Sequence, residues 1–465
     1  MTIIDYMSKI NYYVEFVYYT IASHFTFTRI IIFLVAFSAL YFLFKYYIFK
    51  EKTEIQNTIF NDYEGVVFGK KRLSYYFSPT NSEGHIAVFG GSGLGKTSAL
   101  LIPTLRAWKG TSFTIDISGD ICKNVPIRRK LVYEPESKDT IPYNLFGAID
   151  LLPDDDAKNE ALEQLALLLL PDKPRMDGAD RFFTQEGRKI LTASLIAFYH
   201  KGMDFIEICE KIVGSSWKSL FTEIDDTGNE KAIMYINSFD GANETNTSGC
   251  KQTADGAVKL FATNETIKRS IRRPSSSKEK SFTPASIERY NVFVVIEDSK
   301  LKLYSQLLHI ITAQTMEFFS ERSNDNEHMI LLCLDEFASL GKLEIIDALR
   351  KLRKKHVRIM ILTQSMADLD LCYGVAERKA MMNNFRFKVV LGASDSDTQK
   401  YFAELIGYVT KKKESVAKSD GKTTRTTSEA NVYAIEPAKL DHLKKNLIVL
   451  SPDGWIELKK NFYYA

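Results

Sequence analysis

The chain has 465 residues, more than a single hydrophobic core usually supports, so at least two globular units are expected. Its five cysteines are odd in number and contain no C-x-x-C pair, which argues against a disulfide framework and a cysteine zinc site and favours a reducing compartment. The formal net charge of +3 identifies no partner by itself, so the distribution of charge along the chain is more informative.

The N-terminal 50 residues are predicted to be a membrane anchor. Residues 30–49 read IIIFLVAFSALYFLFKYYIF, which is about the length that spans a bilayer. The one charge in this stretch, Lys45, lies near its end and can reach the lipid headgroups. Further positive charge follows at Lys50 and Lys52, and the positive-inside rule then places the large domain in the cytoplasm. A cleaved signal peptide is disfavoured because the apolar stretch is too long and lacks a small-residue cleavage site.

An earlier apolar segment, residues 10–27, has two interpretations. It carries Glu15 and His24, and a glutamate makes a solitary lipid-facing span costly. The segment is therefore either a first membrane helix paired with the second in a hairpin, or an interfacial helix.

Residues 90–97 complete the pattern G-x-x-x-x-G-K-[ST] between an apolar run at 85–89 and a helix-like stretch at 98–102. This context predicts a phosphate-binding loop whose glycines leave room for phosphate oxygens and whose backbone N–H groups point at the anion. Lys96 is expected to contact the β and γ phosphates of ATP, and the Thr97 hydroxyl to bind Mg²⁺. The expected nucleotide-binding residues are Gly90, Gly91, Ser92, Gly93, Leu94, Gly95, Lys96, Thr97 and Ser98.

The remaining chain alternates strand and helix patterns around a helical stretch. We expect residues 51–150 and 286–465 to form the two parts of a nucleotide-binding domain, and residues 151–285 to form an inserted all-α domain. Continuous apolar strands separated by helix-length segments predict an α/β fold with a mainly parallel sheet, as in RecA-like ATPases. The Lys/Ser/Thr-rich residues 411–428 are expected to be a mobile loop.

Polar residues follow two of the predicted strands. Asp335 and Glu336 end the run 330–334, and in open α/β sheets the strand ends carry ligand-binding groups. Asp335 is expected to hold Mg²⁺ and Glu336 to polarise the attacking water. Gln364 follows the next strand, where its amide could contact the γ-phosphate. The basic segment 350–358 between them is mostly a solvated face, but one of its arginines could reach a neighbouring subunit's γ-phosphate.

In order, these motifs resemble the type IV coupling proteins of the TraG/TraD kind. The similarity runs from about residue 26 onward through GGSGLGKT, DISGD, the helical insert, LLCLDEFASLGK, LTQSMADLDLCYG and IVLSPDGWIELKKNFYYA. The family usually has Asp-Pro-Lys-Gly-Glu where this chain has residues 116–120, so the role of the missing lysine does not carry over.

The resemblance implies a membrane-anchored, hexameric ATPase of the bacterial inner membrane that uses ATP and Mg²⁺. It also implies that Gln364 senses the γ-phosphate and that Arg353 is a finger acting on the neighbouring subunit. The expected function is to bring conjugative DNA with its attached relaxase to a type IV secretion channel. A coupling ATPase for protein effectors only, or a membrane receptor and scaffold that uses ATP for assembly, remain alternatives.

Two basic stretches give independent support for contact with DNA. Residues 268–280 contain six basic residues against the single acid Glu279, and residues 411–425 contain a further six. Such segments could grip the phosphates of single- or double-stranded DNA without reading its sequence. Surface solvation or attraction to anionic membrane lipid is the alternative explanation.

Overall fold

The structure is a computed structural model that describes residues 3–48, 56–58, 63–172, 176–276, 278–419 and 422–464. The chain divides into two compact units, Met1–Glu54 and Ile55–Ala465.

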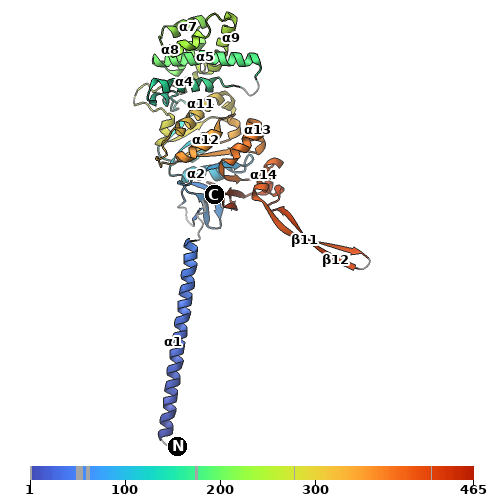
Figure 1. Cartoon of the computed structure of the whole chain (residues 1–465). Coiled ribbons are helices and arrows are strands. Elements are labelled where there is room, and N and C mark those ends of the chain that lie inside the picture. The colour runs from blue at the N-terminus through green and yellow to red at the C-terminus, as the bar shows by residue number, and fades with distance from the viewer. Residues whose placement is uncertain are drawn as a thin grey trace. The chain divides into compact units, whose positions relative to one another are not determined.

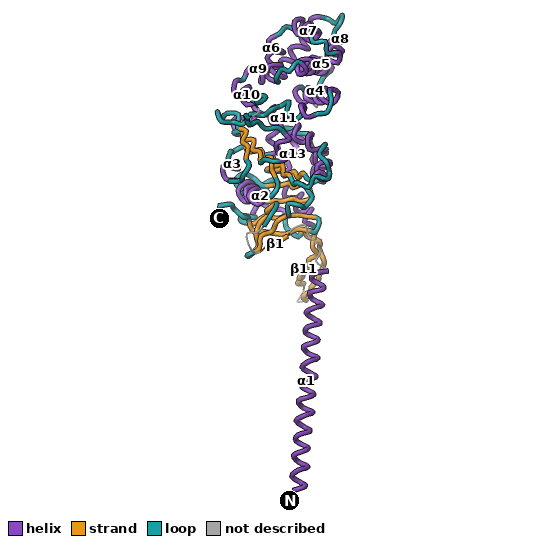
Figure 2. The backbone as a smooth tube through the Cα atoms, turned by 90° about the vertical axis from the view of Figure 1, so that its left-hand side faces the viewer, coloured by secondary structure: helices purple, strands orange, loops and turns teal. Residues whose placement is uncertain are grey.

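The first unit consists of the helix α1 (Ile3–Ile48), which Figure 2 shows without interruption. Residues 10–27 and 30–48 therefore lie on one helix, and the alternative of a hairpin of two helices is not realised. Within the part of the chain that the structure describes, no helix has the length and apolar content needed to cross a membrane. The predicted span at 30–49 extends onto residues 42–49, whose side chains lie outside the described set.

The second unit is built on a large sheet that confirms the predicted α/β fold. Its strands among the described residues follow the order β1-β3-β2-β14-β13-β10-β4-β9-β8-β5-β7-β6. The seven from β10 to β6 pair in parallel, and the remaining pairs are antiparallel. The strands are β1 (Gln56–Thr58), β2 (Val66–Lys71), β3 (Ser74–Ser78), β4 (His85–Phe89), β5 (Thr111–Asp116), β6 (Lys130–Tyr133), β7 (Asn291–Val295), β8 (Ile330–Leu334), β9 (Val357–Thr363), β10 (Phe385–Val390), β13 (Asn446–Ser451) and β14 (Gly454–Lys459).

The central strands β4, β8 and β9 are buried along their whole length, which explains why they are continuous apolar runs and not alternating ones. The helices of this unit are α2 (Ile102–Ala107), α3 (Asp120–Asn124), α4 (Asp155–Leu169), α5 (Gly178–His200), α6 (Phe205–Gly214), α7 (Trp217–Asp225), α8 (Glu230–Asn237), α9 (Glu244–Thr263), α10 (Glu265–Ser270), α11 (Leu301–Ser320), α12 (Ile345–Lys351), α13 (Met366–Asn383) and α14 (Ser396–Ile406).

The segment between β6 and β7 holds α4 to α10 and contains no named strand among its described residues. Figure 1 shows α5, α7, α8 and α9 gathered at one end of this unit, beyond α11. Their apolar side chains nevertheless belong to one continuous core with the sheet, in which Leu195 of α5 and Phe113 of β5 are both buried. The helical insert lies within the second unit.

The expected mobile loop at 411–428 is instead a long antiparallel ribbon, which corrects that prediction. β11 (Tyr408–Ser419) pairs with β12 (Lys422–Tyr433) along the full length of both strands. Figure 1 shows the ribbon projecting from the sheet beside α14. The Lys/Ser/Thr-rich composition indicated a loop, but threonine and valine are also strand formers, and two such runs can satisfy each other's backbone hydrogen bonds.

Buried polar side chains hold β4 and β9 together where both strands begin. The Arg358 guanidinium is almost fully buried and donates to the backbone oxygens of Gly84 and Pro79, at 3.0 and 3.1 Å. The ring Nδ1 of His85 accepts a hydrogen bond from the Ile359 N–H at 2.9 Å. Burial lowers the pKa of His85 to about 4, so the ring is neutral at pH 7 and this nitrogen can act as an acceptor. These contacts fix the pairing of two strands whose opposite ends carry the candidate site.

Candidate active site

The glycine-rich loop leaves β4, as the sequence predicts, and leads into a π-helical turn, η1 (Lys96–Leu101), where a helix-like stretch was expected at 98–102. Gly93 and Gly95 have φ values of +74° and +96°, in the left-handed region that side chains disfavour. A Cβ atom on Gly95 would lie 3.0 Å from the ring of Phe462. The loop therefore needs glycine at both positions to keep its curvature, and at Gly95 also to keep its close packing.

Lys96 is 5% exposed and links the loop to the end of β8, which is separated from β4 by β9 in the sheet. Its ammonium donates to the Gly90 backbone oxygen at 2.9 Å and lies 3.2 Å from a carboxylate oxygen of Glu336. The Gln364 amide donates to the other oxygen of Glu336 at 3.3 Å. Three side chains from the ends of β4, β8 and β9 thus meet, as expected for neighbouring parallel strands.

Glu336 adopts a backbone conformation that stores strain. Its φ of 44° is left-handed, which is uncommon for a residue other than glycine, asparagine or aspartate. Such outliers concentrate at functional sites, where the surrounding structure enforces them. Here the turn directs the carboxylate toward Lys96 and Gln364.

Asp335 has the properties of a metal ligand. It is 4% exposed, and burial, followed by repulsion from Glu336, raises its pKa to about 7. One of its carboxylate oxygens has no hydrogen-bond partner among the described residues. A buried oxygen of this kind suits Mg²⁺ or a water bound to it. The residues present therefore fit the ion.

The rest of the ligand shell would come from Thr97 and from phosphate. The described residues contain no group of three or more His, Cys, Asp or Glu side chains that could hold a metal alone. Mg²⁺ usually binds through one or two protein ligands together with substrate phosphates and water, so this composition agrees with a nucleotide-dependent site.

The residues at 116–120 have a structural role next to this site. Asp116 is fully buried and accepts hydrogen bonds from the backbone N–H groups of Gly119 and Cys122, at 2.9 and 2.7 Å. It therefore holds the turn that leads into α3. This arrangement does not need the lysine that the family usually has in this segment.

Arg353 lies far from the loop of its own chain. It belongs to the turn η6 (Leu352–Lys355), which precedes β9, whereas Gln364 follows that strand. A strand of this length rises about 20 Å, so Arg353 cannot reach a phosphate bound at Lys96 of the same subunit. It is half exposed and lies 3.2 Å from Glu83.

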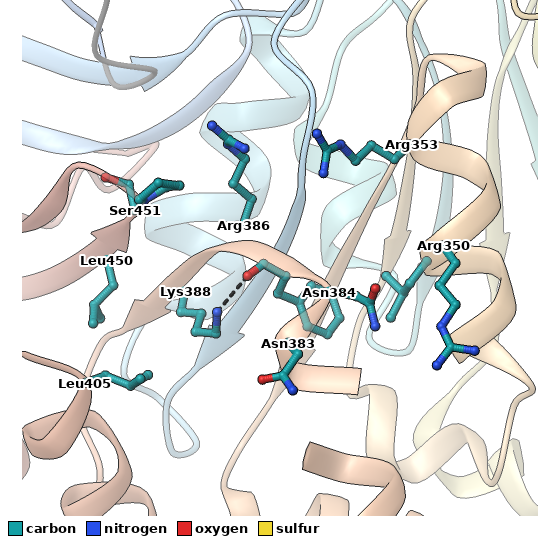
Figure 3. Close-up of a pocket in the computed structure, with 12 residues that line it drawn as sticks. Arg350, Arg353, Asn383, Asn384, Arg386, Lys388, Leu405, Leu450 and Ser451 are labelled. Atoms are coloured by element: carbon teal, nitrogen blue, oxygen red, sulfur yellow. Dashed lines mark hydrogen bonds between the residues drawn. The ribbon is translucent and has the colours of Figure 1, made fainter. Parts of the chain in front are cut away.

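Apart from its contact with Glu83, Arg353 faces a basic hollow. It lines a hollow of about 540 Å³ together with Arg350, Arg386 and Lys388, and no acidic residue lines it among those described. Figure 3 shows Arg353 and Arg386 on one side of the hollow, with Lys388 donating to a backbone oxygen, that of Phe385, at 2.7 Å.

The predicted excess of positive charge at residues 268–280 is wrong. Lys268 pairs with Glu210 and Glu265, at 2.7 and 2.9 Å, and Arg273 pairs with Asp150 at 3.0 Å. The fold brings Glu210 and Asp150 to the cluster from positions distant in sequence, and Glu279 within the cluster pairs with Arg272. The cluster therefore offers much less free positive charge than the sequence indicated.

A backbone contact at the loop was not predicted from the sequence. The Tyr463 N–H donates to the Ser98 backbone oxygen at 3.0 Å, and this contact places the segment after β14 against the loop. The sequence held no local signal for it, since more than 350 residues separate the two positions.

Comparison with known proteins identifies a family. Residues 43–465 match the family model described as type IV secretory system conjugative DNA transfer. Protein VirD4 of Agrobacterium fabrum is 24% identical over 431 residues, covering 87% of this chain and 63% of that protein. A conjugal transfer protein TraG of Rhizobium radiobacter is 22% identical, covering 79% of this chain and 59% of that protein. The chain spans less than two thirds of the length of these relatives.

Solved structures show the same fold. The unbound bacterial conjugative coupling protein TrwBdeltaN70 has a TM-score of 0.67 and 19% identity, with 88% of both chains covered. The plasmid coupling protein TrwB in complex with ADP and Mg²⁺ has a TM-score of 0.62 and 19% identity, covering 81% of this chain and 85% of that one.

The raised pKa of Asp335 predicts a specific dependence of stability on pH. In the folded chain this carboxyl keeps its proton up to about pH 7, whereas in the unfolded chain its pKa returns to 3.8. The contribution of Asp335 to the free energy of unfolding is therefore largest at low pH and falls as pH rises, by on the order of 2 kcal/mol between pH 5 and 7. Asp335→Asn removes this dependence.

Urea unfolding at pH 5, 6 and 7 without Mg²⁺ or nucleotide measures the effect. The Asp335→Asn chain should gain stability relative to wild type as pH rises. Asp120→Asn, which changes an exposed acid in the same unit, should show no such trend. A wild-type to Asp335→Asn difference that stays constant with pH would contradict the assignment of a protonated buried carboxyl.

Proposed function

The chain belongs to the type IV secretory system conjugative DNA transfer family, and we propose that it is an ATP-driven coupling protein that recruits conjugative DNA with its attached relaxase and moves it to a type IV secretion channel. The observation that carries the ATPase assignment is the meeting of Lys96, Glu336 and Gln364 at adjacent strand ends. A scaffold that only bound ATP for assembly would not need a glutamate placed to polarise water.

Each of these side chains has a task in phosphoryl transfer. Lys96 contacts the β and γ phosphates, which compete with Glu336 for its ammonium. Phosphate binding therefore releases the Glu336 carboxylate from its ion pair, so that it can orient and polarise the attacking water. Gln364 holds the γ-phosphate or its water, and Thr97 and Asp335 hold the cation. Mg²⁺, when bound, neutralises the charge that develops on the phosphates.

The nucleotide assignment has support from the structural neighbours. TrwB has been solved with ADP and Mg²⁺ and with the ATP analogue ADPNP. In this chain the same kind of ligand would lie along residues 90–98.

We also propose that α1 anchors the protein in the bacterial cytoplasmic membrane with the second unit in the cytoplasm. Apolar side chains such as Phe33, Leu34 and Val35 are 59 to 70% exposed on this helix, which is unfavourable in water over a long stretch. The basic residues that follow residue 49 favour this orientation. Extraction of cell membranes with carbonate should leave the chain in the pellet, and its release would contradict the anchor.

Arg353 is proposed to act on the nucleotide of a neighbouring subunit in a homohexameric ring. Its position at the far end of β9 prevents action within its own subunit, and its side chain is exposed enough to meet a partner. A planar guanidinium suits the charge of a γ-phosphate in the transition state.

Mixing two inactive variants tests this role. Arg353→Ala chains mixed with Lys96→Ala chains should recover part of the ATP turnover, because some interfaces then combine an intact loop with an intact arginine. Lys354→Ala, which changes the adjacent exposed cation, should retain activity alone. Absence of recovery in rings shown to contain both variants would contradict action between subunits.

If DNA is the cargo, the basic ribbon β11–β12 is proposed to contact its phosphates. Residues 408–433 contain six basic and three acidic residues, and Lys411 and Lys412 are exposed. DNA of unrelated sequences should raise ATP turnover, and this stimulation should weaken steeply with salt because each phosphate contact releases counterions. Replacing Lys411 and Lys412 by glutamine should reduce the slope of log affinity against log salt by about 1.4 to 1.8.

Lys444 and Lys445, two consecutive exposed lysines outside the ribbon, are the matched control. Replacing both by glutamine should leave the salt slope unchanged. Turnover that ignores DNA at low salt but rises with a secreted protein or its adaptor would instead support the alternative of an ATPase for protein effectors.

A further inference from the structure

Two aromatic rings stack beside the phosphate loop. The centroids of Phe462 and Tyr464 lie 5.4 Å apart with an interplanar angle of 27°. Phe462 faces the loop directly, since a Cβ atom on Gly95 would lie 3.0 Å from its ring. Tyr464 is 67% exposed. The pair therefore reaches from the wall of the loop out to solvent.

The segment that carries the rings is held in place by contacts from α2 and η1. The Tyr463 N–H donates to the Ser98 backbone oxygen, and the Arg106 guanidinium donates to the Tyr463 backbone oxygen at 3.2 Å. Arg106 also lies 4.9 Å from the centroid of the Tyr463 ring. An aromatic ring that stays exposed on a fixed backbone is a preformed surface for a flat apolar ligand.

The sheet order indicates which end of a nucleotide would lie there. Glu336 and Gln364 follow β8 and β9, on one side of β4, so the γ-phosphate points to that side. The aromatic segment follows β14, which lies on the opposite side of β4. A nucleotide with its phosphates along residues 90–97 therefore extends its base away from the carboxylates and toward the aromatic pair.

We propose that Phe462 and Tyr464 form the subsite for the nucleotide's base, with Tyr464 presenting its ring for stacking. This inference rests on the proposed nucleotide site and adds to it the group that recognises the base. Stacking accepts any purine, since each has a comparable π-face, so the subsite favours ATP and GTP alike over ligands that have no base.

Equilibrium binding by the full chain tests the proposal with ATP, GTP and inorganic tripolyphosphate as ligands. Tyr464→Ala should weaken the binding of ATP and of GTP by about 5- to 100-fold and leave the binding of tripolyphosphate unchanged. Tyr464→Phe keeps the ring and should bind ATP within about twofold of wild type, since stacking does not need the hydroxyl.

Tyr408→Ala is the matched control, because Tyr408 is also exposed and stacks on Tyr433 at 4.8 Å and 26°, on the ribbon β11–β12. It should leave all three affinities unchanged. Unchanged ATP affinity in Tyr464→Ala would overturn the base subsite, and so would equal loss of ATP and tripolyphosphate, which indicates a damaged loop. A wild-type chain that binds none of the three ligands contradicts the nucleotide site itself.

Discussion

The parallel pairing of β4 with β9, and of β9 with β8, is the constraint on which the site depends. Parallel strands end at the same edge of a sheet, so this pairing brings Lys96 and Gln364 within hydrogen-bonding reach of Glu336 although the three residues are far apart in sequence. The pairing is fixed at the other edge by the buried Arg358 and the neutral His85, which bind the backbone where β4 and β9 begin. A slip in that register would separate the loop from the carboxylates.

The charges of the site are balanced internally, and in the proposed mechanism this balance would couple ligand binding to catalysis. Lys96 is satisfied by a backbone oxygen and by Glu336, while Asp335 avoids an unpaired buried charge by keeping its proton up to about pH 7. Phosphate oxygens and a divalent cation would replace these arrangements together. Lys96 would then exchange partners, Asp335 would lose its proton, and Glu336 would become available to water.

Much of the α/β fold and of the candidate site could be predicted from the sequence because the relevant signals are local. The loop motif, the apolar strands and the acidic pair each occupy a few consecutive residues, and the rule that ligands bind at the strand ends brings them together. The predicted strand at 85–89 coincides with β4, and Asp335 and Glu336 directly follow β8.

The features that were not predicted depend on contacts between segments that are separated in sequence. No property of residues 268–280 indicates that Glu210 and Asp150 neutralise them, because those acids arrive through the packing of other elements. The ribbon was missed because its two strands stabilise each other and no hydrophobic alternation marks them. The aromatic pair near Gly95 was missed because its approach to the loop is also non-local. Only the position of β14 in the sheet brings the segment that follows it to the loop.

The central claim is that Glu336 acts on water in a nucleotide site that Lys96 forms, and parallel measurement of nucleotide affinity and phosphate release tests it most directly. Glu336→Gln should keep ATP affinity within a few fold of wild type and lose phosphate release by at least about a hundredfold, because the glutamate contributes in the transition state. Lys96→Ala should lose both, since the lysine also contacts phosphate in the ground state. Phosphate release at the wild-type rate by Glu336→Gln would contradict the account.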